Sequence, residues 1–179
     1  MRGLDIYKLS HEYVDYLQEK ERTIRGFTKV SNNMSDEYNN SKPYIGVVLD
    51  INGYQYFAPL THPKEHYKNS SRFFNQISTP IQLKNGRDYG RIMFCYMVPV
   101  CNNNVLEPIH INDIEDEKYK SVLMTQYFYM NSKEGNGKIT KKANHLYHKV
   151  YKKPNHYLYK FCCDFELLEK ISTDYQINK

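Results

Sequence analysis

Apolar and polar residues alternate in several short stretches of the first half of the chain, and this pattern predicts β-strands. The first stretch is Leu4–Leu9, and the clearest pair is Tyr44–Ile51 with Tyr54–Leu60. Asn52-Gly53 joins that pair, and this dipeptide favours the two-residue turn of a β-hairpin. Pro59 weakens the end of the second strand and predicts a sheet edge or a bulge there.

Further strands follow with a weaker signal. A second hairpin is predicted around Asn85-Gly86, with a long return arm over Tyr89–Val100, and a last short strand over Leu106–Ile111. Between the first strand and the first hairpin, Arg22–Ser41 is rich in Thr, Ser, Asn and Gly. This composition predicts a long irregular connection.

Helical spacing of apolar residues dominates the second half of the chain and one segment of the first. The predicted helices cover residues 11–20, 115–132, 139–153 and 165–175. Ser10 is expected to cap the first helix, Asn112 or Asp113 the second, and Asp164 the last. Gly135–Gly137 is expected to separate the second helix from the third.

A strand-rich first part and a helical second part predict an α+β fold. We expect a strongly bent antiparallel sheet, or partly open barrel, with peripheral helices. Residues 1–179 show no internal repeat and no linker, so we expect one domain, with a β core over about 1–111 and a helical part over about 112–179.

The net charge of +5 is unevenly distributed. Residues 131–160 contain eight lysines and one acidic residue, Glu134, with three histidines and four tyrosines between them. Lysines attract a phosphate backbone, and tyrosine and histidine rings stack on unpaired bases, so this basic tract favours RNA binding. The alternative is an ordinary solvent-exposed helix face.

Other classes of protein fit the sequence poorly. Four cysteines without a CxxC pair match neither a zinc framework nor a secreted disulfide scaffold. No apolar run has the length of a membrane span, and the N-terminus lacks a signal-peptide core. We therefore expect a cytoplasmic protein with no membrane partner.

The most reactive cluster of side chains follows the second strand of the first hairpin, at Thr61, His62 and Lys64. Together with Lys42, these groups suit RNA cleavage by the neighbouring 2′-hydroxyl, which needs proton transfer and cationic donors to phosphate. Histidine changes charge near neutral pH and is a sensible acid or base. The alternative is a polar turn in which Thr and Pro serve the backbone.

Metal and cofactor chemistry is not favoured by the sequence. The phosphate-binding glycine loops are absent. His62 with His66, or His145 with His148, has a spacing that holds a metal on a helix, but no third ligand is evident. We predict no cofactor and no metal.

The segment KPYIGVVLDINGYQYFAPLTHPK, residues 42–64, resembles the signature of the type III toxin–antitoxin endoribonucleases of the ToxN/AbiQ family. Members carry a lysine before an aromatic-IG(I/V)VL strand and an APLTSPK strand end. Further similarities are scattered from end to end, and include Tyr13, Tyr38, the Tyr119-Lys120 pair with Gln126, and the segment CDFELLEK.

The resemblance implies a Kid/MazF-like sheet and a metal-independent, sequence-specific endoribonuclease that leaves 2′,3′-cyclic phosphate ends. It also implies a repeat-encoded RNA pseudoknot antitoxin that the toxin processes and that inhibits it in a closed protein–RNA assembly. The substrate would be cellular or phage mRNA, in phage defence by abortive infection, and DNA is not an expected partner.

The resemblance and the basic tract together select the candidate site residues. The catalytic set is Thr61, His62, Lys64 and Lys42. The RNA-binding set is Tyr13, Tyr38, Tyr119, Lys120, Gln126, Lys141, Lys142, His145, Lys149, Lys152 and Lys153.

One position departs from the family pattern, because members commonly have Ser where this chain has His62. His62 then takes over that place with stronger acid–base chemistry, contacts the RNA phosphate instead, or marks an altered enzyme. A rival function from another class is a non-catalytic RNA-binding module, which needs the basic tract but neither His62 nor Lys64.

Overall fold

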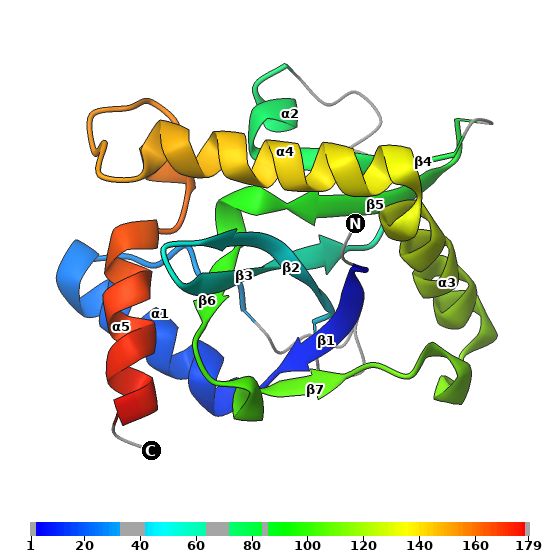
Figure 1. Ribbon diagram of the computed structural model, residues 1–179, viewed down its shortest axis with the longest axis horizontal. Coiled ribbons are helices and arrows are strands. Elements are labelled where there is room, and N and C mark those ends of the chain that lie inside the picture. The colour runs from blue at the N-terminus through cyan, green and yellow to red at the C-terminus, as the bar shows by residue number, and fades with distance from the viewer. Residues whose placement is uncertain (1–2, 33–41, 64–71, 84–85, 178–179) are drawn as a thin grey trace.

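The computed structural model describes residues 3–32, 42–63, 72–83 and 86–177. In this part of the chain, seven strands form one antiparallel sheet in the order β4-β5-β3-β2-β1-β7, with β6 also paired to β3 (Figure 1). The strands are β1 Asp5–Leu9, β2 Tyr44–Ile51, β3 Tyr54–Thr61, β4 Ser78–Gln82, β5 Asp88–Met93, β6 Val98–Val100 and β7 Leu106–Pro108. The predicted α+β fold with a bent antiparallel sheet is confirmed.

The bend of the sheet lies along β3. The first half of this strand pairs with β6, where Tyr56 lies opposite Pro99, and its end pairs with β5, where Leu60 lies opposite Ile92. Between β5 and β6 the chain makes the buried 3₁₀ turn Phe94–Tyr96. The continuous arm predicted over Tyr89–Val100 is therefore wrong, because that segment changes direction to follow both halves of β3.

The first hairpin matches its prediction closely. Asn52 and Gly53 both have positive φ, 54° and 81°, as a type I′ turn requires. Pro59 is not at an edge, however, because β3 lies between β2 and β5. The irregularity falls one strand away, in the register shift between Ile45 and Leu49 of β2.

Five α-helices surround the sheet in the described part of the chain. They are α1 His11–Arg25, α2 Phe74–Ile77, α3 Glu117–Asn131, α4 Lys133–Val150 and α5 Phe165–Ile177. The Ser10 hydroxyl accepts from the Tyr13 amide at 3.2 Å, and Asp164 accepts from the Leu167 amide at 3.2 Å, so two predicted caps are confirmed. The cap of α3 is Asp116, since Asn112 and Asp113 lie in a separate 3₁₀ turn.

Two helix boundaries differ from the sequence prediction. Helix α1 continues to Arg25, well into the segment predicted to be irregular. Helix α4 begins at Lys133 and includes the glycines that were expected to break it. Gly135 is needed there for packing, because a Cβ at this position would lie 2.0 Å from the Tyr129 carbonyl oxygen of α3.

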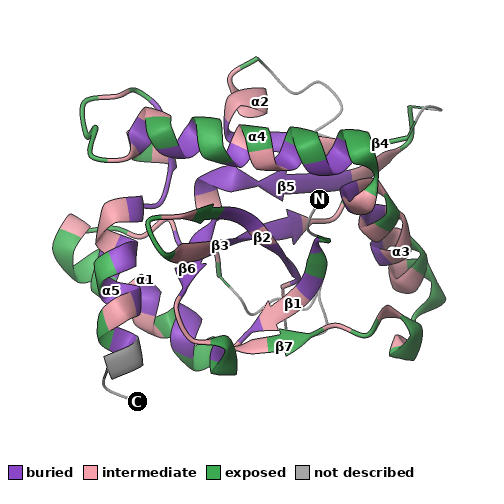
Figure 2. Ribbon diagram, viewed as in Figure 1, coloured by how far each residue is buried: buried purple, intermediate pink, exposed green. Residues whose placement is uncertain are grey.

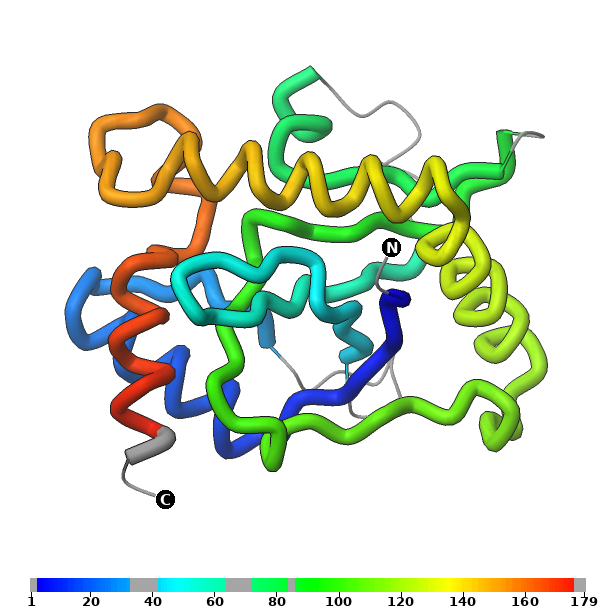
Figure 3. The backbone as a smooth tube through the Cα atoms, in the orientation of Figure 1, coloured from blue at the N-terminus to red at the C-terminus, as the bar shows by residue number. Residues whose placement is uncertain are grey.

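The helices are arranged around the sheet in a way that leaves one end of β3 next to α3. Helix α4 crosses over β4 and β5, α3 flanks the sheet on one side, and α1 packs with α5 on the other (Figures 1 and 3). Figure 2 shows α4 with buried residues toward the sheet and exposed residues outward. None of the described helices has the length and apolar character needed to cross a membrane.

Candidate active site

Strand pairing places Thr61 at the end of β3 beside β5 and brings the start of β2 alongside the residues before it. On one side Thr61 pairs with Arg91 of β5. On the other side Tyr44 pairs with Pro59, and the Leu60 amide donates to the Pro43 carbonyl at 2.8 Å. Pro43, the residue after Lys42, is therefore fixed beside Leu60, the residue before Thr61.

The Thr61 hydroxyl is engaged by the sheet itself. Its oxygen accepts from the Arg91 amide at 3.1 Å and lies 3.5 Å from the Arg91 carbonyl oxygen. The sequence placed Thr61 in the catalytic set. In this structure its hydroxyl instead fixes the last residues of β3 against β5.

Gly90 allows the two strands to come this close. It has a φ of 101°, and a Cβ there would lie 1.9 Å from the Thr61 carbonyl oxygen. The same carbonyl accepts from Gln126 Nε2 at 3.3 Å, and that nitrogen also donates to the Tyr89 carbonyl at 2.6 Å. Gln126 is 2% exposed, so it braces the backbone at the end of β3 from α3 and does not offer an RNA-binding surface.

His62 contacts Tyr119 of α3, which is another of the candidate residues. Its half-buried ring lies 5.6 Å from the Tyr119 ring, centroid to centroid, at an interplanar angle of 49°. Tyr119 is in the first turn of α3, where its amide donates to the Asp116 carboxylate at 2.9 Å. Lys120 is held locally, since its ammonium donates to the Asn112 carbonyl at 2.9 Å and lies 3.6 Å from Glu117.

The Lys42 ammonium donates to the Ser31 hydroxyl at 2.6 Å. The loop before Ser31 is anchored by Glu21, a fully buried carboxylate at the end of α1. One Glu21 oxygen accepts from the Thr28 hydroxyl at 2.6 Å and the Lys29 amide at 2.7 Å.

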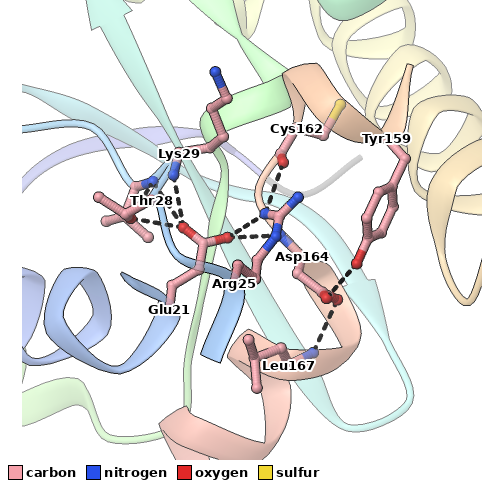
Figure 4. A network of polar contacts seen from close by, with 9 residues as sticks. Glu21, Arg25, Thr28, Lys29, Tyr159, Cys162, Asp164 and Leu167 are labelled. Carbon is pink, nitrogen blue, oxygen red and sulfur yellow. Dashed lines mark hydrogen bonds and ion pairs between the residues drawn. The ribbon is translucent and has the colours of Figure 1, made fainter. Parts of the chain in front are cut away.

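The other Glu21 oxygen pairs with Arg25 at 2.6 Å and accepts from the Asp164 amide at 2.9 Å. Figure 4 shows these groups converging from α1, the following loop and the start of α5. Asp164 in turn accepts from the Tyr159 hydroxyl. Sequence reasoning missed Glu21, because nothing in the pattern around it distinguishes a buried anchor from an exposed helical glutamate.

A buried cationic group lies beside the strand end. Arg91 is 1% exposed and donates to the Ser78 hydroxyl at 3.0 Å and the Asn75 side-chain oxygen at 2.5 Å. The Lys142 ammonium of α4 donates to the backbone carbonyls of Asn75 and Ser78 at 3.1 and 3.3 Å. Burial, with the nearby charges of Lys138 and Arg91, lowers the pKa of Lys142 to about 8. Arg91 was also missed, since it reads as an ordinary strand residue.

The remaining basic candidates lie on the outward side of α4 and in the turn after it. Lys149 is half-buried and donates to the Gln76 side chain at 3.4 Å. Lys141, His145, Lys152 and Lys153 are exposed. Lys141 and His145 belong to α4, the upper helix in Figure 2, and Lys152 and Lys153 follow it in the chain.

Tyr13 does not fit its expected place. It is 1% exposed, its hydroxyl donates to the Pro99 carbonyl at 2.6 Å, and that hydroxyl lies 2.9 Å from Ser172. Burial raises its pKa well above the ordinary value for tyrosine. Tyr13 therefore joins α1, β6 and α5 in the core, where it does not line an RNA groove.

Two other candidates, Lys64 and Tyr38, lie outside the residues that the structure describes, as does His66. Within the described ranges, no group of three or more His, Cys, Asp or Glu side chains is arranged to hold a metal ion.

The chain matches a known protein family and relatives of that family over most of its length. Residues 5–173 match the family described as Toxin ToxN, type III toxin-antitoxin system. The chain is 31% identical over 176 residues to the endoribonuclease ToxN of Bacillus thuringiensis subsp. kurstaki, covering 95% of this chain and 83% of that relative.

Two solved structures share the fold over nearly the whole chain. The first is from work on a bacterial type III toxin–antitoxin system with selective toxin inhibition by a non-coding RNA pseudoknot; it has a TM-score of 0.78 and 28% identity, covering 98% of this chain and 99% of that one. The second is AbiQ, a lactococcal anti-phage endoribonuclease of a type III toxin–antitoxin system; it has a TM-score of 0.80 and 26% identity, again covering 98% and 99%.

Proposed function

The chain belongs to the ToxN family of type III toxin–antitoxin toxins, and from that premise we propose that it is a metal-independent endoribonuclease. The observation that supports the proposal is the contact of the His62 ring with Tyr119 at the end of β3, where the Leu60 amide also donates to the carbonyl of Pro43, the residue after Lys42. Lys42, Thr61 and Tyr119 are residues of the family signature quoted above, and His62 departs from it.

The reaction that suits this site is attack of the ribose 2′-oxygen on the adjacent phosphorus. The 2′-O–P bond forms, the P–O5′ bond breaks, and the products are a 2′,3′-cyclic phosphate and a 5′-hydroxyl. One proton leaves the 2′-hydroxyl and one reaches the 5′-oxygen, so neither water nor a metal ion is consumed. The protein must move these protons and neutralise charge on the phosphate oxygens.

We assign proton transfer to His62, because an imidazole can accept or donate a proton near neutral pH. The Lys42 ammonium, steered by Ser31, stabilises the developing phosphorane charge. Lys64, two residues after His62 in the sequence, is assigned the same task. Thr61 acts indirectly, since its hydroxyl and carbonyl hold the strand end on which His62 lies.

We further propose that the partner and inhibitor of the protein is a folded RNA antitoxin encoded as repeats, which the toxin processes and with which it forms a closed assembly. The solved relative whose inhibition by an RNA pseudoknot is described has the same fold over 98% of this chain. The exposed lysines of α4 supply a cationic surface beyond the active site, as a large structured RNA requires. The substrate is cellular or phage mRNA in the cytoplasm.

The rival function is a non-catalytic RNA-binding module. Separate measurements of toxicity and of RNA affinity distinguish it from the proposed endoribonuclease. We expect His62→Ala and Lys42→Ala to relieve growth arrest while changing RNA affinity less than about tenfold, because they remove groups used mainly in the transition state. His11→Ala, at an exposed histidine of α1, is the matched control. A parent protein that binds RNA without cleaving it would favour the binding module.

A further inference from the structure

A cavity of about 310 Å³ lies where β1, β7 and α3 meet. It lies on the side of the sheet where the β1–β7 edge faces α3, as Figure 1 shows for the three elements. Its lining includes Asp5 and Tyr7 of β1, Pro108 of β7, His110 and Ile111 after it, and Tyr127 of α3.

Strand register explains why acidic, imidazole and aromatic groups share this cavity. Tyr7 pairs with Pro108, and the Ile109 amide donates to the Ile6 carbonyl at 2.9 Å. The same register sets Asp5 across from His110. Because side chains alternate along a strand, Asp5 and Tyr7 project from one face of the sheet, and Tyr127 approaches this cavity from α3.

The cavity and the active site share one helix. Tyr119, which contacts His62, and Tyr127, which lines the cavity, are both on α3. Eight residues of α-helix span about 12 Å. That separation suits a strand of RNA whose scissile phosphate lies at His62 and whose near-neighbour nucleotide reaches the cavity.

We propose that this cavity is a base-binding subsite that takes one unpaired RNA base carrying an exocyclic amino group. The inference rests on the proposed endoribonuclease function. Unpaired bases are commonly held by stacking on tyrosine rings, which Tyr7 and Tyr127 provide. The volume is at the lower end for small-ligand sites and suits one base.

The acidic residue sets the specificity of the subsite. The Asp5 carboxylate is an acceptor only, so it pairs with the amino group of adenine, cytosine or guanine. Uracil has no exocyclic amino group. Where cytosine has its amino group, uracil has a carbonyl oxygen that a carboxylate repels, so the single ring N3–H is the only donor it offers. His110 adds a second hydrogen-bonding group at the other strand of the pair.

The test uses a single-stranded RNA in which each position flanking the cleaved bond is randomised. The wild-type protein and its variants each cleave this RNA, and the products are sequenced to give the base preference at each position. The wild-type protein is expected to disfavour uracil at one flanking position by about tenfold. Asp5→Asn, whose amide can both donate and accept, is expected to remove most of that discrimination, and Tyr127→Ala to weaken selection of any base there.

The matched control is Glu107→Gln. Glu107 is exposed and belongs to the same strand pair. Its Oε1 lies 3.8 Å from Lys8 Nζ, on the face of the sheet opposite to that of Asp5 and Tyr7. It should keep the wild-type base preference. Asp5 is also exposed, so its variant is expected to fold, and thermal unfolding checks this.

The outcomes separate the two proposals. Wild-type cleavage with the same preference at every position in Asp5→Asn and Tyr127→Ala would overturn the subsite and leave the endoribonuclease standing. No uracil discrimination by the wild-type protein would also overturn it. A wild-type protein that cleaves no RNA would overturn both. A preference lost in the two variants and kept in Glu107→Gln would support the subsite.

Discussion

Gly90 shows how a single residue fixes the proposed active site. Its left-handed backbone and missing side chain let β5 approach the Thr61 carbonyl, while Gln126 holds that carbonyl from the other side. Neither Gly90 nor Gln126 carries a sequence signal for this role. The hairpin before His62 could be predicted because Asn-Gly turns are local, whereas the approach of β5 depends on contacts between distant segments.

We expect Gly90→Ala to lower the free energy of unfolding by about 1–3 kcal/mol, since alanine is strained at this φ. RNA cleavage should fall further than stability explains, because the new Cβ displaces the carbonyl of the residue before His62. The control is Gly137→Ala on α4, where an added Cβ would have no neighbouring atom within 4 Å. This variant should raise the free energy of unfolding by about 0.5–1 kcal/mol, measured by urea titration. Equal activity in the two variants would contradict this role of Gly90.

Lys142 gives a prediction about pH. Its pKa is lowered to about 8 in the folded protein, while an unfolded lysine titrates near 10.4. Between these two pH values the unfolded chain binds more protons than the folded chain, so the free energy of unfolding rises with pH. Lys142 therefore destabilises the folded protein most below pH 8, and this destabilisation disappears as the pH approaches 10. The Lys142→Met variant removes the charge, so its free energy of unfolding should lack that rise.

The measurement is urea unfolding of both proteins at pH 7.0 and 9.5, at equal ionic strength. The buried tyrosines, whose pKa values are raised, lower the free energy of unfolding only above about pH 10. The buried thiols of Cys95 and Cys163, whose pKa values burial also raises, lower it from about pH 8.5 upward, but equally in both proteins. The quantity compared is therefore the difference between the wild-type protein and Lys142→Met at each pH. Parallel pH dependence of the two proteins would show that Lys142 is not desolvated as the structure indicates.

At the scale of elements, the sequence correctly predicts those strands and helices whose ends are marked by neighbouring turn or capping residues. The β2–β3 hairpin and the caps of α1 and α5 fall where Asn52-Gly53, Ser10 and Asp164 indicate. The start of α4 was missed because Gly135 normally breaks helices, and only the crossing with α3 shows why a glycine stands there. The 3₁₀ turn between β5 and β6 was also missed, because it lets both strands pair with β3, and that pairing is a contact between distant segments.

The Glu21 anchor is the element-scale feature that we expect to matter most for activity. Glu21→Gln leaves the buried Arg25 partner without a carboxylate and weakens the hold on the loop that leads to Ser31 and Lys42. We expect a loss of about 3 kcal/mol in the free energy of unfolding and a lower kcat for RNA cleavage, measured at a temperature where the variant remains folded.

The matched control is Glu19→Gln, an exposed glutamate on the same helix, which should change neither quantity measurably. If Glu21→Gln is destabilised but keeps the wild-type kcat, then the anchor supports only the fold and Lys42 is positioned by other contacts.

At the scale of the whole molecule, α4 gives the protein a positive face that the active site alone does not need. The sequence predicted this tract from eight lysines and one acid in residues 131–160. It could not show that Lys142 turns inward while Lys141 and Lys153 remain exposed, because that division depends on where α4 meets β4.

Binding of the RNA antitoxin should therefore depend steeply on salt. Each exposed lysine that contacts a phosphate adds about 0.7–0.9 to the slope of log affinity against log salt, the lower value for single strands and the upper for a duplex. Lys141→Ala/Lys153→Ala should therefore flatten the slope by about 1.4–1.8, measured by fluorescence anisotropy in a His62→Ala background that does not cleave the RNA. Lys20→Ala, on α1, should leave it unchanged, and an unchanged slope in the double variant would remove α4 from the RNA interface.

We propose that the site at the end of β3 cleaves RNA through the neighbouring 2′-hydroxyl and without a metal ion. The most direct test is incubation of the purified protein in EDTA with two matched RNAs, one of which carries a single 2′-deoxy nucleotide at the cleaved position. We predict that the all-ribose RNA is cut to a 2′,3′-cyclic phosphate end, seen by mass spectrometry, and that the deoxy-substituted RNA stays intact. Cleavage only with added metal, or cleavage of the deoxy-substituted RNA at the same bond, would contradict the account.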